Sequence, residues 1–240
     1  MEQKAVNPNN VYGKTCHLES MPLEVFQKLG IQVNHALQHE GVSFLKTLPD
    51  KSIPCSFFDP QYRGVLDKMD YGNEGGRQKE RALLMQMDEV KIGEFIREIN
   101  RVLVPSGHLF LWLDKFHLIE GIKEWFKDTE LNVVDMITWN KMRIGMGYRS
   151  RRTAEYLLIL QKSPKRAKGV WCRHNIPDVW NEKQTNTHAH SKPIKLQSAL
   201  ISSVTREGDV ILDPAAGSYT VMQSAFIEKR NFIGCDLVGG

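Results

Sequence analysis

Two short apolar segments, far apart in the chain, each end abruptly at an aspartate followed by a proline. The first stops at Asp59-Pro60 and the second at Asp213-Pro214. Apolar runs of strand length that stop at a turn signal are typical of buried strands. Ligands of open α/β sheets bind at the carboxyl ends of the strands. We therefore expect both aspartates to lie at a functional edge of one sheet.

Helix and strand signals alternate along most of the chain. We expect helices at 22–29, 42–48, 88–103, 116–126, 193–204 and 221–228. We expect strands at 53–58, 108–113, 132–139, 156–161, 209–212 and 232–235. This order predicts an α/β fold with a Rossmann-like, doubly wound and mostly parallel sheet. Residues 105–107 are expected to end the third helix, and 63–87 to form a long loop.

Length and composition favour one globular domain over residues 1–240, without an internal repeat or linker. No apolar run approaches the length of a membrane span, and residues 1–10 lack the apolar core of a signal peptide. We therefore expect a cytoplasmic protein that does not enter membranes. The four cysteines are scattered, which argues against a disulfide framework or a zinc site.

The charge distribution is mildly basic, with a net charge of +4 and a pI of about 8.8. Basic residues cluster in 141–152 and 162–173. Such clusters suit a polyanionic partner such as nucleic acid, although a solvated charged face is the more common explanation for them.

The segment from Asp213 to Thr220 has the composition of a ligand-binding turn between a strand and a helix. Its small residues let the backbone approach a ligand closely, and the start of a helix offers unpaired N–H donors. Asp236 ends the next expected strand, where an acidic residue commonly accepts hydrogen bonds from ribose hydroxyls. Alone, this pattern is equally compatible with an ordinary strand, turn and helix.

The segment Asp59-Pro60-Gln61-Tyr62 suits an exocyclic amino group of a base. An ionised carboxylate accepts hydrogen bonds and can orient the amine, the proline stiffens the backbone, and Tyr62 offers a flat face for stacking. A base inside a duplex must be flipped out to reach such a site. Alone, an ordinary Asp-Pro turn is the simpler explanation.

Taken together, these motifs and the segments around them resemble the beta-class DNA amino-methyltransferases, which act on adenine N6 or cytosine N4. The resemblance covers 41–62, 97–113, 139–162 and 188–237. In that class the catalytic motif comes first, a target-recognition region follows, and the cofactor motif comes last. This chain has the same order, and the resemblance implies a circularly permuted class I methyltransferase fold that uses S-adenosylmethionine.

The resemblance also implies roles for individual residues. The catalytic motif corresponds to Asp59, Pro60 and Tyr62. The residues implied in cofactor binding are Asp59, His188, Lys192, Asp213, Pro214, Ala215, Ala216, Gly217, Ser218 and Asp236. The target-recognition region is expected within 141–190. Double-stranded DNA is the implied partner, and a homodimer is a further implication of the family.

Aspartate at position 59 favours adenine N6 as the target, because this residue is usual in the adenine enzymes of the family. Gln61 and Tyr219 replace family residues, and the sequence ends soon after Asp236. Three alternatives therefore stay open: an N4-cytosine enzyme, an RNA base methyltransferase, or an inactive DNA-binding relative or subunit. A metal site is not expected, because His174, His188 and His190 lack a fourth ligand.

Overall fold

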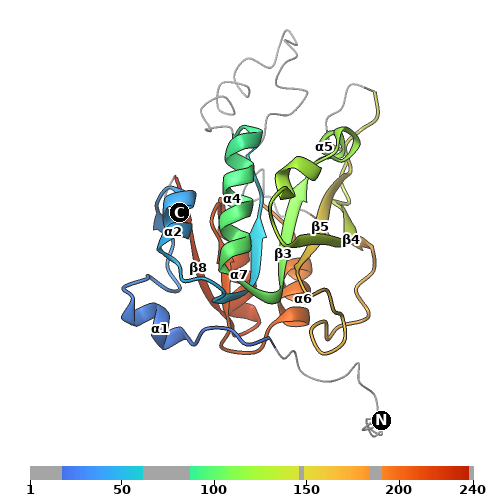
Figure 1. The fold of residues 1–240 in the computed structure, drawn as a ribbon. Coiled ribbons are helices and arrows are strands. Elements are labelled where there is room, and N and C mark those ends of the chain that lie inside the picture. Colours follow the sequence, from blue (N-terminus) through green and yellow to red (C-terminus); the bar gives the residue numbers. More distant parts are fainter. Residues whose placement is uncertain (1–17, 62–86, 146–148, 184–190, 238–240) are drawn as a thin grey trace, which may run out of the picture.

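A computed structural model describes residues 18–61, 87–145, 149–183 and 191–237, and their centre is a twisted sheet (Figure 1). The strands within these residues lie in the order β1-β8-β7-β2-β3-β5-β4-β6. Neighbouring strands are parallel, except that β5 is antiparallel to both β3 and β4. The strand bounds are β1 Leu37–Gln38, β2 Ile53–Phe58, β3 Leu103–Leu113, β4 Leu131–Asn140, β5 Ala154–Lys162, β6 Val179–Asn181, β7 Val210–Asp213 and β8 Asn231–Asp236. The mostly parallel α/β sheet predicted from the sequence is confirmed.

Helices cover both faces of the sheet (Figure 1), and the sequence of β2 reflects this. All six residues of β2 are buried, as expected for a strand with a helical layer on either side. Phe58 packs in the cluster formed with α2 and α4, whereas Phe57 packs in the cluster formed with α6 and α7. Successive side chains of a strand point to opposite faces, so this short segment anchors both halves of the core.

The helices agree with the sequence prediction except at one place. Their bounds are α1 Leu23–Lys28, α2 Gly41–Thr47, α4 Glu89–Val102, α5 Lys115–Glu120, the 3₁₀ helix η3 Lys123–Phe126, α6 Ile194–Val204 and α7 Thr220–Ile227. The single helix expected over 116–126 is wrong. Gly121 has a φ of 90°, which a right-handed helix cannot contain, so α5 ends there and η3 follows. Among the described residues, no helix has both the length and the apolar character needed to cross a bilayer.

The expectation that residues 105–107 end the third helix is wrong. These residues lie inside β3. Pairing with β2 shifts from Ile53 opposite Leu103 to Cys55 opposite His108, so the intervening residues form a bulge. Ser106 has a φ of 63° within it. A proline is tolerated at such a bulge because the ladder hydrogen bond is already interrupted. The short strands β1 and β6 were not predicted, and most of the loop expected at 63–87 lies outside the described residues.

Candidate active site

The carboxyl ends of three adjacent parallel strands bring three aspartates to one edge of the sheet. Asp59 directly follows β2, Asp213 is the last residue of β7, and Asp236 is the last residue of β8. Because β7 lies between β8 and β2, these residues are neighbours at one edge although 177 positions separate the first from the last (236 − 59). The arrangement matches the edge expected from the two Asp-Pro motifs.

Asp213 is a buried carboxyl group with an acidic environment. It is 5% exposed, and the Ala215 N–H donates to its Oδ1 at 3.2 Å. Burial raises the pKa of Asp213 well above its usual value, and the charges of Asp59 and Asp236 raise it further. A ligand that brings positive charge or N–H and O–H donors to this carboxyl group would relieve both effects.

The turn after β7 folds over the end of β8. The Ala216 N–H donates to the Cys235 carbonyl at 2.9 Å, and the Gly217 N–H donates to Asp236 Oδ2 at 2.9 Å. Gly217 has a φ of 51°, which glycine adopts without steric cost. Gly217 is exposed and Ser218 half-buried, whereas Pro214 and Ala216 are buried. The outer part of the turn is therefore accessible to a ligand at the edge of the sheet.

Tyr219 occupies the position at which the beta-class DNA amino-methyltransferases, the family that this sequence resembles, have a glycine. It keeps a left-handed conformation, with a φ of 53°, and is only 4% exposed. Its hydroxyl donates to the Leu37 carbonyl at 3.0 Å, and its ring packs edge-on against Phe232. Burial raises the pKa of Tyr219 to about 12. The side chain thus points into the protein, away from the exposed surface of the turn.

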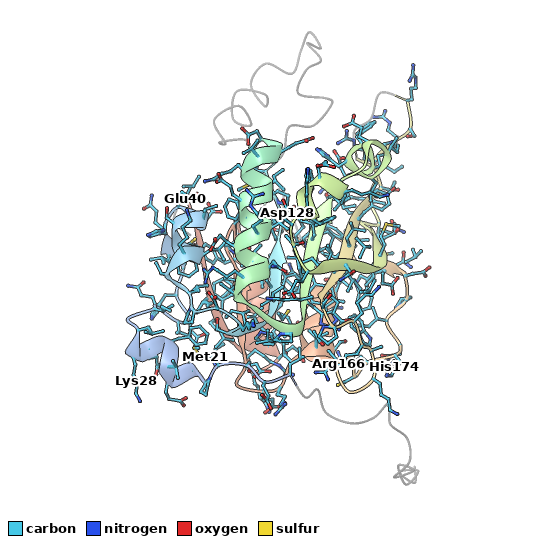
Figure 2. The ribbon with its side chains drawn as sticks, viewed as in Figure 1. Met21, Lys28, Glu40, Asp128, Arg166 and His174 are labelled. Carbon is cyan, nitrogen blue, oxygen red and sulfur yellow. The ribbon has the colours of Figure 1, made fainter. Side chains whose placement is uncertain are left out.

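The start of α2 supports this turn from the side. A Cβ atom on Gly41 would lie 2.4 Å from the Pro214 carbonyl oxygen and 2.4 Å from the Phe95 ring. Glu40, labelled in Figure 2, directly precedes Gly41 at the start of α2. Its carboxylate accepts a hydrogen bond from the Ser43 N–H at 2.7 Å. Sequence analysis did not identify this contact, because it depends on packing between segments distant in the chain.

Asp59 belongs to a chain of alternating charges. Lys192 Nζ lies 2.9 Å from Asp59 Oδ2 and 2.8 Å from Glu155 Oε2, and Lys141 Nζ lies 3.0 Å from Glu155 Oε1. Burial disfavours the charged form of Glu155, but the two lysines outweigh it and lower its pKa to about 2. Burial likewise opposes the Lys192 ammonium, but Asp59 and Glu155 raise its pKa. Glu155 and Lys192 are therefore both ionised near neutral pH.

Sequence analysis did not predict this pairing. It assigned Lys192 to the cofactor, placed Lys141 in a basic cluster, and noted Glu155 only as part of a family segment. The one signal in the sequence is an acidic residue at the start of an apolar strand, Glu155 before 157–160. Such a charge needs a partner when the strand is buried.

The remaining residues of the catalytic motif are only partly described. Pro60 is buried and Gln61 is exposed, and the Met87 N–H donates to the Gln61 carbonyl at 2.8 Å. The chain therefore leaves this edge at Gln61 and returns to it at Met87. Tyr62 and His188, both expected in the site, lie outside the described residues.

The chemistry of the three aspartates fits S-adenosylmethionine. This cofactor carries a sulfonium, an ammonium group and ribose hydroxyls, which are positive charges and hydrogen-bond donors. A buried carboxyl group with a raised pKa, beside two further carboxylates, offers acceptors and negative charge for such groups. The accessible turn at Gly217 and Ser218 lies beside them.

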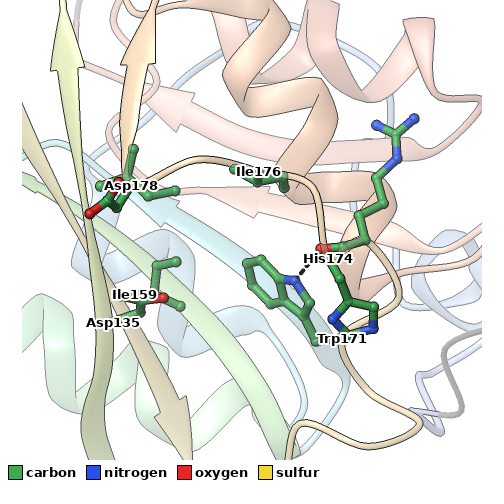
Figure 3. Close-up of a pocket in the computed structure, with 8 residues that line it drawn as sticks. Asp135, Ile159, Trp171, His174, Ile176 and Asp178 are labelled. Carbon is green, nitrogen blue, oxygen red and sulfur yellow. Dashed lines mark hydrogen bonds between the residues drawn. The ribbon is translucent and has the colours of Figure 1, made fainter. Parts of the chain in front are cut away.

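A cavity of about 240 Å³ lies elsewhere, on the sheet face formed by β4 and β5 (Figure 3). Its lining residues are Asp135, Ile137, Ile159, Trp171, Arg173, His174, Ile176 and Asp178. His174 is labelled at the end of the molecule opposite the start of α4 (Figure 2). None of these residues is among the expected catalytic or cofactor-binding residues, whereas six of them lie within the expected recognition region 141–190. The fully buried Trp139 also serves the core, and its indole N–H donates to the Glu182 carbonyl at 2.8 Å.

Known proteins resemble this chain in sequence. The model of the DNA methylase family matches residues 55–238. The type II methyltransferase M.HhaII of Haemophilus parahaemolyticus is 58% identical over 211 residues, which cover 87% of this chain and 92% of that protein. The type II methyltransferase M2.MboI of Moraxella bovis is 24% identical over 230 residues, which cover 83% of this chain and 81% of that protein.

Solved structures share the fold. The M1.HpyAVI complex with S-adenosylmethionine has a TM-score of 0.60 at 18% identity, over 84% of this chain and 92% of that one. The cytosine-N4-specific PvuII DNA methyltransferase has a TM-score of 0.61 at 14% identity, over 87% of this chain and 86% of that one. The edge described above, the family match over most of the chain and the 58% identical relative lead to one conclusion. The chain belongs to the DNA methylase family and is a DNA methyltransferase.

Proposed function

We propose that this enzyme methylates N6 of adenine in double-stranded DNA, as the modification enzyme of a type II restriction–modification system. One observation carries the assignment of its site. Asp59 after β2 and Asp213 on β7 stand at the ends of adjacent strands. A base held at the first and a cofactor held at the second would therefore be neighbours, as methyl transfer requires.

Asp59 acts as the acceptor that orients the adenine amino group. Lys192 contacts Oδ2 of its carboxylate. The carboxylate accepts one N–H hydrogen bond, and the Pro60 carbonyl accepts the other. This leaves the nitrogen lone pair directed toward the methyl group. With S-adenosylmethionine bound, the N–C bond would form as the methyl–sulfur bond breaks, and the surplus proton of the nitrogen would pass to solvent water. Positioning and fixed charge supply the acceleration, so no covalent enzyme intermediate is needed.

The target adenine reaches Asp59 by flipping out of the duplex, because a stacked base is inaccessible. Tyr62 stacks on the flipped ring, an arrangement that typically contributes about 1–3 kcal/mol per base. Aspartate at position 59 supports adenine over cytosine, because the resemblance links this residue to the adenine enzymes.

S-adenosylmethionine, when bound, supplies an electrophilic methyl group on sulfur. We assign the residues that hold it to the turn Asp213–Ser218, with Asp236 as acceptor for ribose hydroxyls. The accessible Gly217 and Ser218 support this assignment. The roles of His188 and Lys192 toward the cofactor stay predictions from the family resemblance.

Target recognition belongs, in this proposal, to residues 141–190 of a single domain. Lys141 and Thr153 are joined by a backbone hydrogen bond of 2.8 Å, and Gly145 and Arg152 by another of 2.8 Å. An irregular extension beyond the ends of β4 and β5, joined by these two hydrogen bonds, therefore lies next to the catalytic edge. Its arginines suit phosphate contacts, which fix the register of a protein on DNA. The homodimer and the cytoplasmic location stay predictions.

The test is product analysis. Double-stranded DNA is incubated with the enzyme and S-adenosylmethionine, then digested to nucleosides and measured by mass spectrometry. The proposal predicts N6-methyladenine. N4-methylcytosine would contradict the adenine assignment, and methylation of RNA in place of DNA would contradict the choice of nucleic acid.

A further inference from the structure

We propose that Glu155 is a positioning residue for methyl transfer, which acts by holding the Lys192 ammonium in one place against Asp59. The inference rests on the proposed function, because it gives Asp59 the role of orienting the target amine. It adds a residue outside both family motifs and links the catalytic aspartate to the start of the recognition region.

The Lys192 ammonium has defined partners on three sides. It donates to Glu155 Oε2 at 2.8 Å, contacts Asp59 Oδ2 at 2.9 Å, and lies 5.0 Å from the centre of the Trp112 ring. An ammonium group has three N–H donors. Two carboxylates and one aromatic face therefore fix its position.

Glu155 is in turn fixed by two lysines. Its Oε2 accepts from Lys192, whereas its Oε1 accepts from Lys141 at 3.0 Å. Its side chain is 28% exposed, and those of Lys141 and Lys192 are each 14% exposed. A largely buried carboxylate with a separate ammonium on each oxygen has little freedom to rotate.

The antiparallel strand explains how Glu155 reaches the catalytic edge. β5 runs opposite to β3, so its first residues lie where β3 ends. Glu155 pairs with Trp139 near the end of β4, two residues before Lys141. The ion pair of Glu155 with Lys141 therefore joins the first residue of the recognition region to the ion pair of Lys192 with Asp59.

The function follows from what Lys192 would do without Glu155. A long lysine side chain attracted by Asp59 alone would no longer be held in one position. The Asp59 carboxylate would then lose the fixed contact that sets its orientation toward the adenine amino group. Glu155 holds the ammonium at Asp59 Oδ2, so that this orientation is kept. Loss of Glu155 should therefore slow the chemical step more than it weakens cofactor binding.

The experiment compares Glu155→Gln, Glu155→Asp and the double variant Glu155→Gln/Lys141→Met in the full chain. The double variant restores the charge balance of the four groups without restoring the hold on Lys192. Single-turnover methylation rates on duplex DNA are measured, together with the S-adenosylmethionine Kd by calorimetry. Arg101→Met is the control for loss of a hydrogen-bonded cation, since Arg101 lies outside the recognition region and donates to the Leu48 carbonyl away from this edge.

We expect Glu155→Gln to lower the single-turnover rate at least tenfold and to change the cofactor Kd less than threefold. The double variant should stay slow, and Glu155→Asp should recover part of the rate. Arg101→Met should lower the melting temperature and leave the rate per folded molecule unchanged.

A change in the pH profile distinguishes positioning from a structural role. Asp59 and Glu155 face Lys192, and Lys141 faces Glu155. Removing the charge of Glu155 lowers the pKa of Lys192. The rate of Glu155→Gln should therefore fall at alkaline pH values where the wild-type rate is still constant.

Three results would overturn the inference: an unchanged rate in Glu155→Gln, a wild-type rate in the double variant, or a loss explained entirely by the cofactor Kd. Failure of the proposed function has a different signature, because wild-type enzyme would then produce no N6-methyladenine.

Discussion

At the scale of single residues, Asp213 is a carboxyl group whose environment opposes its ionisation. It is buried at the end of β7, and Asp59 and Asp236 add negative charge around it. The raised pKa means that the ligand-free protein retains a proton that the unfolded chain has lost. Stability should therefore fall as pH rises from about 4, the unfolded pKa, through the raised folded value.

Proton release on cofactor binding tests this environment. The positive charge of S-adenosylmethionine should lower the pKa of Asp213, so binding should release protons at pH values between about 4 and the raised pKa. Calorimetry in buffers with different ionisation enthalpies measures this release. Asp213→Asn should abolish most of it, whereas the exposed Asp135→Asn control should leave it unchanged. Equal release from wild type and Asp213→Asn would contradict the assignment.

At the scale of elements, the position of the cofactor turn depends on how closely α2 approaches it. Gly41 lets the start of this helix contact the backbone of Pro214 and the ring of Phe95 on α4. The same turn is also held by β8, because the Cys235 carbonyl and the Asp236 carboxylate accept hydrogen bonds from the N–H groups of Ala216 and Gly217. Three separate segments thus determine one turn.

Gly41→Ala should disturb this packing. The added methyl group meets a backbone carbonyl that cannot rotate away, so we expect a destabilisation of about 1–3 kcal/mol and a weaker cofactor Kd. Thermal unfolding and calorimetry measure the two effects. Gly93→Ala on α4 is the control, because its methyl group meets only the flexible end of Arg97 and alanine favours a helix. An unchanged cofactor Kd in Gly41→Ala would show that the turn does not depend on α2.

At the scale of the whole molecule, most of the sheet could be predicted from the sequence, because buried parallel strands are continuous apolar runs. The residues 53–58 were predicted as a strand with the bounds that β2 has. The strands β1 and β6 were missed because two or three residues carry no periodicity. The bulge at 105–107 was missed because its Pro-Ser-Gly sequence is typical of a turn.

The site divides in the same way. The aspartates at strand ends could be predicted, because each follows an apolar run and a parallel sheet gathers such ends at one edge. The link from Lys141 through Glu155 to Lys192 could not. It depends on the antiparallel register of β5 against β4, and this register is not encoded in any local pattern.

The most direct test of this site is methyl transfer from labelled S-adenosylmethionine to duplex DNA by wild-type enzyme and by Asp59→Ala. Asp59 lies at the edge where base and cofactor are proposed to meet. The wild type should transfer the label to adenine N6, and Asp59→Ala should lose the rate by about two to three orders of magnitude while remaining folded. A folded Asp59→Ala variant that transfers the label at the wild-type rate would contradict the role assigned to this aspartate.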